Sequence, residues 1–202
     1  MLVNEGFMIR RLEIDELKSI YYSQIKKDFP RNERRPFHLL RKLHNNGRYL
    51  CLVYEEENQI IAYATFIHDE AKDSVLLDYF AVSEKRRGGG IGSKFITLVC
   101  EQWSDKAGII IECETPDLAK NEGDRDLRKR RIDFYLRAGA ESTHAKWRMF
   151  GVAYDILWMP TNPKRCQPDV ICDIAELYAL SLPISLRPLF IRSLMKANGE
   201  LL

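Results

Sequence analysis

Runs of β-branched and aromatic residues, separated by polar breaks, predict most of the strands of this chain. The polar stretch 55–59 (EEENQ) joins two such runs and predicts a hairpin. The run 108–114 (GIIIECE) is apolar enough to be a central strand. Two further runs near the end of the main pattern predict a closing hairpin. The predicted strands cover residues 7–12, 49–54, 60–68, 74–82, 108–114, 143–150 and 152–159.

Apolar residues spaced three and four positions apart predict helices between these strands. The charge-dense stretch that begins at Asp117 is expected to start as a solvated loop and to become a helix ending near Ala138, with Gly139 as its stop signal. The other helices predicted before residue 160 cover 15–27, 37–44 and 91–103. Strands and helices in this order require a mixed sheet, and so an α/β (α+β) fold.

The last 40 or so residues predict a helical extension. Residues 160–168 contain three prolines and are typical of a linker, while 169–180 and 186–195 carry apolar residues at helical spacing. This extension is too apolar to remain in solvent, so we expect it to pack on the main domain or on a partner subunit, for example in a homodimer. We divide the chain into a domain of residues 1–160 and an extension of residues 161–202.

Composition and charge narrow the class of protein. The chain has 202 residues, of which 46% are apolar, and its 31 basic and 29 acidic side chains leave a net charge of +2. This balance argues against a nucleic-acid binder. The five cysteines form no CxxC pair and the four histidines are scattered, so we expect no metal site and a reducing compartment. Without a signal peptide or a long apolar run, a cytoplasmic protein with no membrane contact is expected.

One stretch, 84–95 (EKRRGGGIGSKF), carries the strongest chemical signal. It places four glycines within five positions, between a predicted strand and a predicted helix. Glycines let the backbone approach a ligand closely, and the unpaired N–H groups at a helix start favour an anion. The stretch therefore predicts a phosphate-binding loop.

The loop does not fit two common phosphate-binding motifs. A P-loop ends in Gly-Lys-Ser/Thr, whereas this stretch ends in Gly92-Ser93-Lys94. The dinucleotide fingerprint G-x-G-x-x-G belongs near the start of a doubly wound unit, whereas this loop lies in mid-chain after strands that look antiparallel.

A third motif fits better. Residues 87–92 (RGGGIG) match the R-x-x-G-x-G/A signature of the GCN5-related N-acetyltransferase (GNAT) superfamily, and the chain resembles that family in two longer stretches. Residues 80–96 look like the family's fourth strand, pyrophosphate loop and third helix, and 131–140 (RIDFYLRAGA) resemble its tyrosine segment. The order of elements agrees along residues 7–159. The resemblance implies a mostly antiparallel twisted sheet flanked by helices, with the C-terminal helices as an appendage.

The resemblance also implies where acetyl-CoA binds. In that family the pantetheine arm lies along the fourth strand, and the pyrophosphate lies on the N–H groups of the glycine loop. Many members carry an asparagine where this chain has Arg128, which could instead reach a CoA phosphate. The implied cofactor-binding residues are Phe80, Ala81, Val82, Arg87, Gly88, Gly89, Gly90, Ile91, Gly92, Ser93 and Arg128.

Catalytic roles follow from the chemistry and from the same resemblance. Tyr135 matches the family's tyrosine, and a phenol placed there can protonate the thiolate that leaves a thioester. The attacking amine must lose a proton, for which a carboxylate is the usual acceptor. The family has no fixed base, so four candidates stay open, in the order Glu114, Glu33, Asp78 and Glu112.

The sequence indicates less about the acceptor than about the acetyl donor. We expect its pocket to draw on the closing hairpin and on Phe29, Glu33, Arg34, Arg35 and Phe37. The acidic group would suit a cationic amine, and the arginines would suit an amino-acid-like acceptor. The predicted function is acetyl-CoA-dependent N-acetylation of a primary amine on a small molecule. The alternatives are a protein lysine or N-terminal acetyltransferase and a non-catalytic acyl-CoA sensor.

Overall fold

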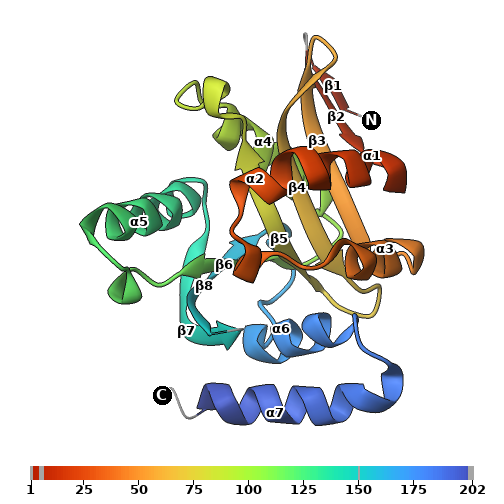
Figure 1. Ribbon diagram of the computed structural model, residues 1–202, viewed down its shortest axis with the longest axis vertical. Coiled ribbons are helices and arrows are strands. Elements are labelled where there is room, and N and C mark those ends of the chain that lie inside the picture. The colour runs from red at the N-terminus through yellow and green to blue at the C-terminus, as the bar shows by residue number, and fades with distance from the viewer. Residues whose placement is uncertain (1, 5–6, 150, 200–202) are drawn as a thin grey trace.

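One eight-stranded sheet runs through the protein, shown in Figure 1 as a computed structural model that describes residues 2–4, 7–149 and 151–199. The strand order is β1-β2-β3-β4-β5-β6-β8-β7, and every neighbouring pair is antiparallel except β5 and β6. The strands are β1 (Leu2–Asn4), β2 (Phe7–Arg11), β3 (Tyr49–Glu56), β4 (Gln59–His68), β5 (Ser74–Val82), β6 (Gly108–Glu114), β7 (Glu141–Met149) and β8 (Val152–Pro160). The predicted mixed, mostly antiparallel sheet is confirmed.

The strand predictions hold with small changes. Strands β5 and β6 have the predicted bounds, and both hairpins form, while Phe150 at the end of one predicted strand lies outside the described residues. Strand β1 was not predicted, because three residues are too short to show a periodic pattern. It pairs with β2, with Val3 opposite Met8.

The helices surround the sheet. They are α1 (Ile14–Ile20), α2 (Lys26–Asp28), α3 (Phe37–Asn45), α4 (Ile91–Gln102), α5 (Glu122–Arg137), α6 (Val170–Ala179) and α7 (Arg187–Gly199). A π-helical turn at residues 21–25 joins α1 to α2, so the helix predicted at 15–27 is continuous but widened. Side-chain caps set two of the starts: Asn121 accepts a hydrogen bond from the amide of Asp124, and Asp169 accepts two from the first turn of α6.

The two faces of the sheet carry separate cores. One core packs α4 and α5 against the sheet, while the other joins α1 and α3 to the C-terminal helix α6. Ile174 and Leu177 of α6 are fully or almost fully buried, and α7 lies outermost, beyond α6 (Figure 1). The boundary drawn at residue 160 stays a prediction. Among the described residues, no helix is long and apolar enough to cross a membrane.

The feature that positions the site is the separation of β5 from β6. The two strands pair in parallel only from Ser74 opposite Gly108 to Leu77 opposite Ile111. Leu77 and Tyr79 of β5 lie opposite two neighbouring residues of β4. Asp78, between them, is therefore an extra residue on β5, and the register of the pairing shifts there. A bulge of this kind bends its strand. Beyond it, among the residues that the structure describes, β6 pairs only with β8, and the remaining length of β5 has an open edge.

Candidate functional site

A cavity of about 1030 Å³ opens where β5 and β6 separate. Its walls come from the open edge of β5, from β6, from α5, from the segment after α2, from β8 and from the C-terminal helices. Of the predicted cofactor-binding residues, those that line it are Phe80, Ala81, Val82, Arg87 and Gly92. Gly89 and Ile91 instead line a smaller neighbouring hollow with basic walls that include Lys85 and Lys94.

The glycine loop has the geometry that an anion site requires. Gly88 and Gly90 have φ of +83° and +77°, a conformation that L-residues with side chains rarely adopt. Gly90 stands directly before α4 and offers no side-chain cap, so the first amides of the helix lack the acceptor that caps usually supply. Arg87 Nε donates a 3.0 Å hydrogen bond to the Val82 carbonyl, which ties the loop to the end of β5.

The absence of a side chain at Gly92 leaves room between the start of α4 and α5. A Cβ at this position would lie 3.2 Å from the Phe134 ring and 3.6 Å from Val82. A side chain at residue 92 would require the Phe134 ring to shift by a few tenths of an ångström, so the glycine eases the close approach of the start of α4 to α5. Arg86, by contrast, is held by an ion pair with Glu56.

Tyr135 reaches the same cavity from α5. Its ring packs edge-on against Phe134 and Phe80, at centroid distances of 5.0 and 6.1 Å. Burial raises the pKa of its phenol well above the ordinary range, with a smaller contribution from the nearby Cys113. The hydroxyl therefore stays protonated at neutral pH, as a proton donor must.

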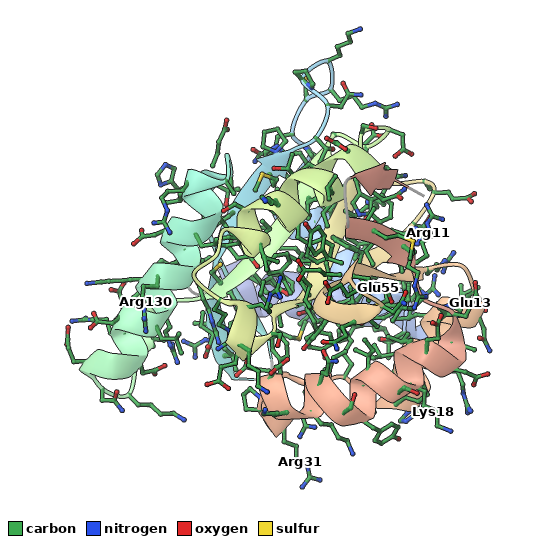
Figure 2. The ribbon with its side chains drawn as sticks, turned by 90° about the horizontal axis from the view of Figure 1, so that it is seen from above. Arg11, Glu13, Lys18, Arg31, Glu55 and Arg130 are labelled. Carbon is green, nitrogen blue, oxygen red and sulfur yellow. The ribbon has the colours of Figure 1, made fainter. Side chains whose placement is uncertain are left out.

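The two carboxylates predicted as leading base candidates have different surroundings. Glu114 is held by Arg128 at 3.0 Å and by Arg131 at 3.4 Å. Glu33 is half-buried at the end of a short 3₁₀ turn and lines the cavity. Burial, and then the negative charge of Glu114, raise the Glu33 pKa to about 6. Arg31, two residues earlier, extends away from the body of the protein (Figure 2).

Arg128 lies where the sequence suggested a CoA phosphate contact, but its guanidinium is engaged elsewhere. Besides Glu114 it contacts Asp124 and donates a 2.8 Å hydrogen bond to the Thr115 carbonyl. Only 8% of the residue is exposed, and it does not line the cavity. Its role in cofactor binding stays a prediction, and these contacts leave its guanidinium less available to a CoA phosphate.

The other two carboxylates belong to a buried polar network. Asp78 accepts a 2.9 Å hydrogen bond from Arg35 Nε and a 3.0 Å bond from the Tyr49 hydroxyl, so both of its oxygens are engaged. Glu112 Oε2 accepts a 2.7 Å bond from the hydroxyl of Tyr178 on α6. Burial raises the Glu112 pKa to about 7, although the Tyr178 hydrogen bond lowers it.

Sequence reasoning missed Tyr178, Leu182 and Phe190, which the C-terminal extension brings to the cavity. The predicted Phe29, Glu33, Arg34 and Arg35 line it, as does Tyr154 of the closing hairpin, whereas the predicted Phe37 does not. Phe37 instead packs against the Tyr21 ring. The helical stripe of α6 predicts burial of Tyr178 but gives no sign of what its hydroxyl meets.

Comparison with known proteins agrees with this architecture. The sequence profile of the acetyltransferase (GNAT) domain matches residues 47–139. No curated protein matches the sequence. Among solved structures, the fold is similar to that of spermidine N-acetyltransferase from Vibrio cholerae in complex with CoA and spermine, with 13% identity over 78% of this chain and 97% of that one and a TM-score of 0.58.

Two further structures share the fold. The ribosomal-protein-S18-alanine N-acetyltransferase from Escherichia coli is 17% identical over 81% of this chain and 97% of its own, with a TM-score of 0.54. Ard1 from Thermoplasma volcanium is 17% identical over 77% of this chain and 97% of its own, with a TM-score of 0.54. The matched profile spans the separated strands, the glycine loop and the tyrosine helix, so residues 47–139 of this chain are similar to the acetyltransferase (GNAT) domain.

Proposed function

We propose that the protein is an acetyl-CoA-dependent N-acetyltransferase acting on a primary amine of a small molecule. One observation carries the proposal: the open edge of β5, Arg87 and Gly92 at the two ends of the glycine loop, and Tyr135 all line one cavity. The unpaired backbone of β5 suits the amides of a pantetheine arm, and the amides at the start of α4 suit a pyrophosphate. Acetyl-CoA would supply the activated acetyl group.

Two side chains of this chain perform the proton transfers in the proposed reaction. The acceptor nitrogen attacks the thioester carbonyl carbon, a C–N bond forms and the C–S bond breaks. Glu33 accepts the proton that the nitrogen loses, and a carboxylate with a pKa of about 6 is well matched to this role near neutral pH. Tyr135 donates its proton to the departing thiolate and regains one from solvent.

We assign Glu114 a different part. Its carboxylate is engaged by two arginines, so it is less available to an incoming amine than Glu33. Its negative charge contributes to the raised pKa of Glu33, so it acts on the proton transfer through its neighbour.

The cavity favours a small acceptor over a protein. Ser181, Leu182 and Phe190 of the extension line it opposite the main domain, which narrows the space available to a polypeptide. A protein acceptor and a non-catalytic acyl-CoA sensor are the alternatives that an experiment must separate.

The test uses the full chain with acetyl-CoA and a panel of primary amines, amino acids and lysine-containing peptides, with release of free CoA thiol as the signal. We expect turnover on small amines and a higher melting temperature with CoA. Turnover on peptides alone would favour a protein acceptor. Stabilisation by CoA without turnover of any acceptor would favour the sensor, and failure of CoA to stabilise the protein would overturn the cofactor assignment.

A further inference from the structure

A buried polar network links the C-terminal extension to the wall of the cavity. The Tyr178 hydroxyl of α6 donates its 2.7 Å hydrogen bond to Glu112 of β6, and the Arg35 guanidinium lies 4.2 Å from the centre of the Tyr178 ring. Arg35 in turn pairs with Asp78 of β5. The extension therefore contacts both strands at the point where they separate.

Within this network one acceptor atom is unused. Glu112 Oε1 is buried and has no hydrogen-bond partner among the described residues, although Glu112 lines the cavity. A buried carboxylate oxygen without a donor is unfavourable, and such atoms call for a ligand or a bound water. The nearby Arg35 does not balance the charge of Glu112, because its cation already pairs with Asp78 at 2.9 Å. Glu112 therefore favours a ligand that is positively charged.

We propose that the unused oxygen of Glu112 binds the amino group of the acceptor, and that Tyr178, contributed by the C-terminal extension, is the positioning residue that keeps this carboxylate ionised and oriented. The inference rests on the proposed function, because it assumes that the cavity takes an amine. It assigns the extension a part in acceptor specificity.

The groups that face Glu112 show why the hydroxyl matters. Asp78 from β5 disfavours the ionised form, while Arg35 and the Tyr178 hydroxyl favour it. Tyr154 from β8 also lies in range, since the Glu112 charge helps to raise its pKa. Arg35 and Asp78 act in opposite directions, and the Tyr178 hydrogen bond, the largest of the contributions that favour the charged form against burial, is the one that a single substitution can remove.

Tyr178→Phe tests this directly, since it keeps the ring stacked on Arg35 and removes only the hydroxyl. The matched control is Tyr63→Phe, which removes a 2.8 Å hydrogen bond from a tyrosine hydroxyl to another carboxylate, Asp28. For each variant, ¹³C NMR titration gives the Glu112 pKa, and steady-state kinetics with the best amine of the panel give KM and kcat between pH 6 and 9.

We expect Tyr178→Phe to raise the Glu112 pKa and to raise the acceptor KM about tenfold near pH 6.5, as for a lost hydrogen bond to a charged group. The acceptor KM should return toward that of the wild type near pH 8.5, where Glu112 is ionised in both proteins. The KM for acetyl-CoA should not change. Glu112→Gln should raise the acceptor KM about tenfold near pH 8.5, where the wild-type carboxylate is ionised, and by less near pH 6, and high pH should not restore it because the amide cannot ionise.

Several results would overturn the proposal. They are an unchanged Glu112 pKa in Tyr178→Phe, an equal effect of Tyr63→Phe on the Glu112 pKa, a Tyr178→Phe defect that high pH does not relieve, or an unchanged acceptor KM in Glu112→Gln. Absence of turnover by the wild-type protein would instead overturn the proposed function, and the NMR titration would still decide whether Tyr178 controls the charge of Glu112.

Discussion

Glu114 at the end of β6 and Arg128 of α5 form a 3.0 Å ion pair in which 8% of Arg128 is exposed. The pair joins the strand to the helix that carries Tyr135. A carboxylate that looks like a base in the sequence therefore serves to hold the site together. Its neighbour Glu33 keeps its side chain available to the cavity.

Glu33 and Glu114 should respond differently to the same substitution. Glu33→Gln should lower kcat about 100-fold, the scale of general-base catalysis, without any loss of stability. Glu114→Gln should lower the free energy of unfolding by about 2 kcal/mol, because a charged hydrogen bond to Arg128 is lost. Kinetics and urea denaturation measure the two effects. A larger loss of kcat in Glu114→Gln than in Glu33→Gln, with stability retained, would restore Glu114 as the base.

The raised pKa values of Glu33 and Glu112 predict how stability depends on pH. Burial favours the protonated form of both groups in the folded state, so the folded protein binds more protons than the unfolded chain between pH 4.5 and about 7. The free energy of unfolding contributed by these groups therefore falls as the pH rises through this window.

Thermal denaturation of wild-type protein, Glu33→Gln and Glu112→Gln across this pH range measures the effect. Each substitution should flatten the decline of Tm toward pH 7, because the neutral amide no longer titrates. Parallel curves for all three proteins would contradict the assignment of these pKa values.

Tyr135→Phe should leave donor binding intact and slow the chemical step. Removal of the phenol proton should lower kcat about 100-fold while the affinity for CoA, measured by calorimetry, stays within about twofold of the wild type. Because burial raises the phenol pKa, the wild-type rate should show no basic limb from this group up to pH 9. An unchanged kcat in the variant would mean that another group protonates the thiolate.

The glycine loop can be tested at Gly90 against Gly47. Both have a positive φ, +77° and +65°, and both have open space around the position of a Cβ. Alanine should cost about 1 kcal/mol of stability at either position, because both conformations are left-handed. Only Gly90→Ala should also raise the KM for acetyl-CoA, since only this residue precedes α4. Equal donor KM values for the two variants would argue that the loop does not hold the pyrophosphate.

Two truncations separate the roles of the C-terminal helices. Removal of residues 161–202 exposes the apolar core that α6 covers, so we expect an insoluble protein. Removal of residues 183–202 keeps α6 and Tyr178 and should leave a soluble protein with a higher acceptor KM, because Phe190 leaves the cavity wall. Expression tests and kinetics give the outcome, and a fully active protein without residues 161–202 would contradict both expectations.

The predicted homodimer can be tested with the same shorter truncation. Ile184, just before α7, is 78% exposed, and Leu189, in the first turn of α7, is 67% exposed. If these side chains pair between subunits, light scattering should give a dimer for the full chain and a monomer without residues 183–202. A monomeric full chain would reject the dimer.

The sequence by itself determined the strands and the glycine loop to which we assign the acetyl donor. The period of the apolar residues predicted β5 and β6 to the residue, and the glycines of the loop carry their conformational requirement in their identity. These signals are local, because a strand, a turn or a helix start depends on residues that are neighbours in the chain.

The tertiary structure alone decided the acceptor side. Whether Glu114, Glu33 or Glu112 is available depends on partners 14 to 66 residues away, such as Arg128 and Tyr178. The charge state of a carboxylate is set by burial and by nearby charges, neither of which appears in its own stretch of sequence. The fold brings the C-terminal extension to the strand opening, and this contact gave Glu112 its partner.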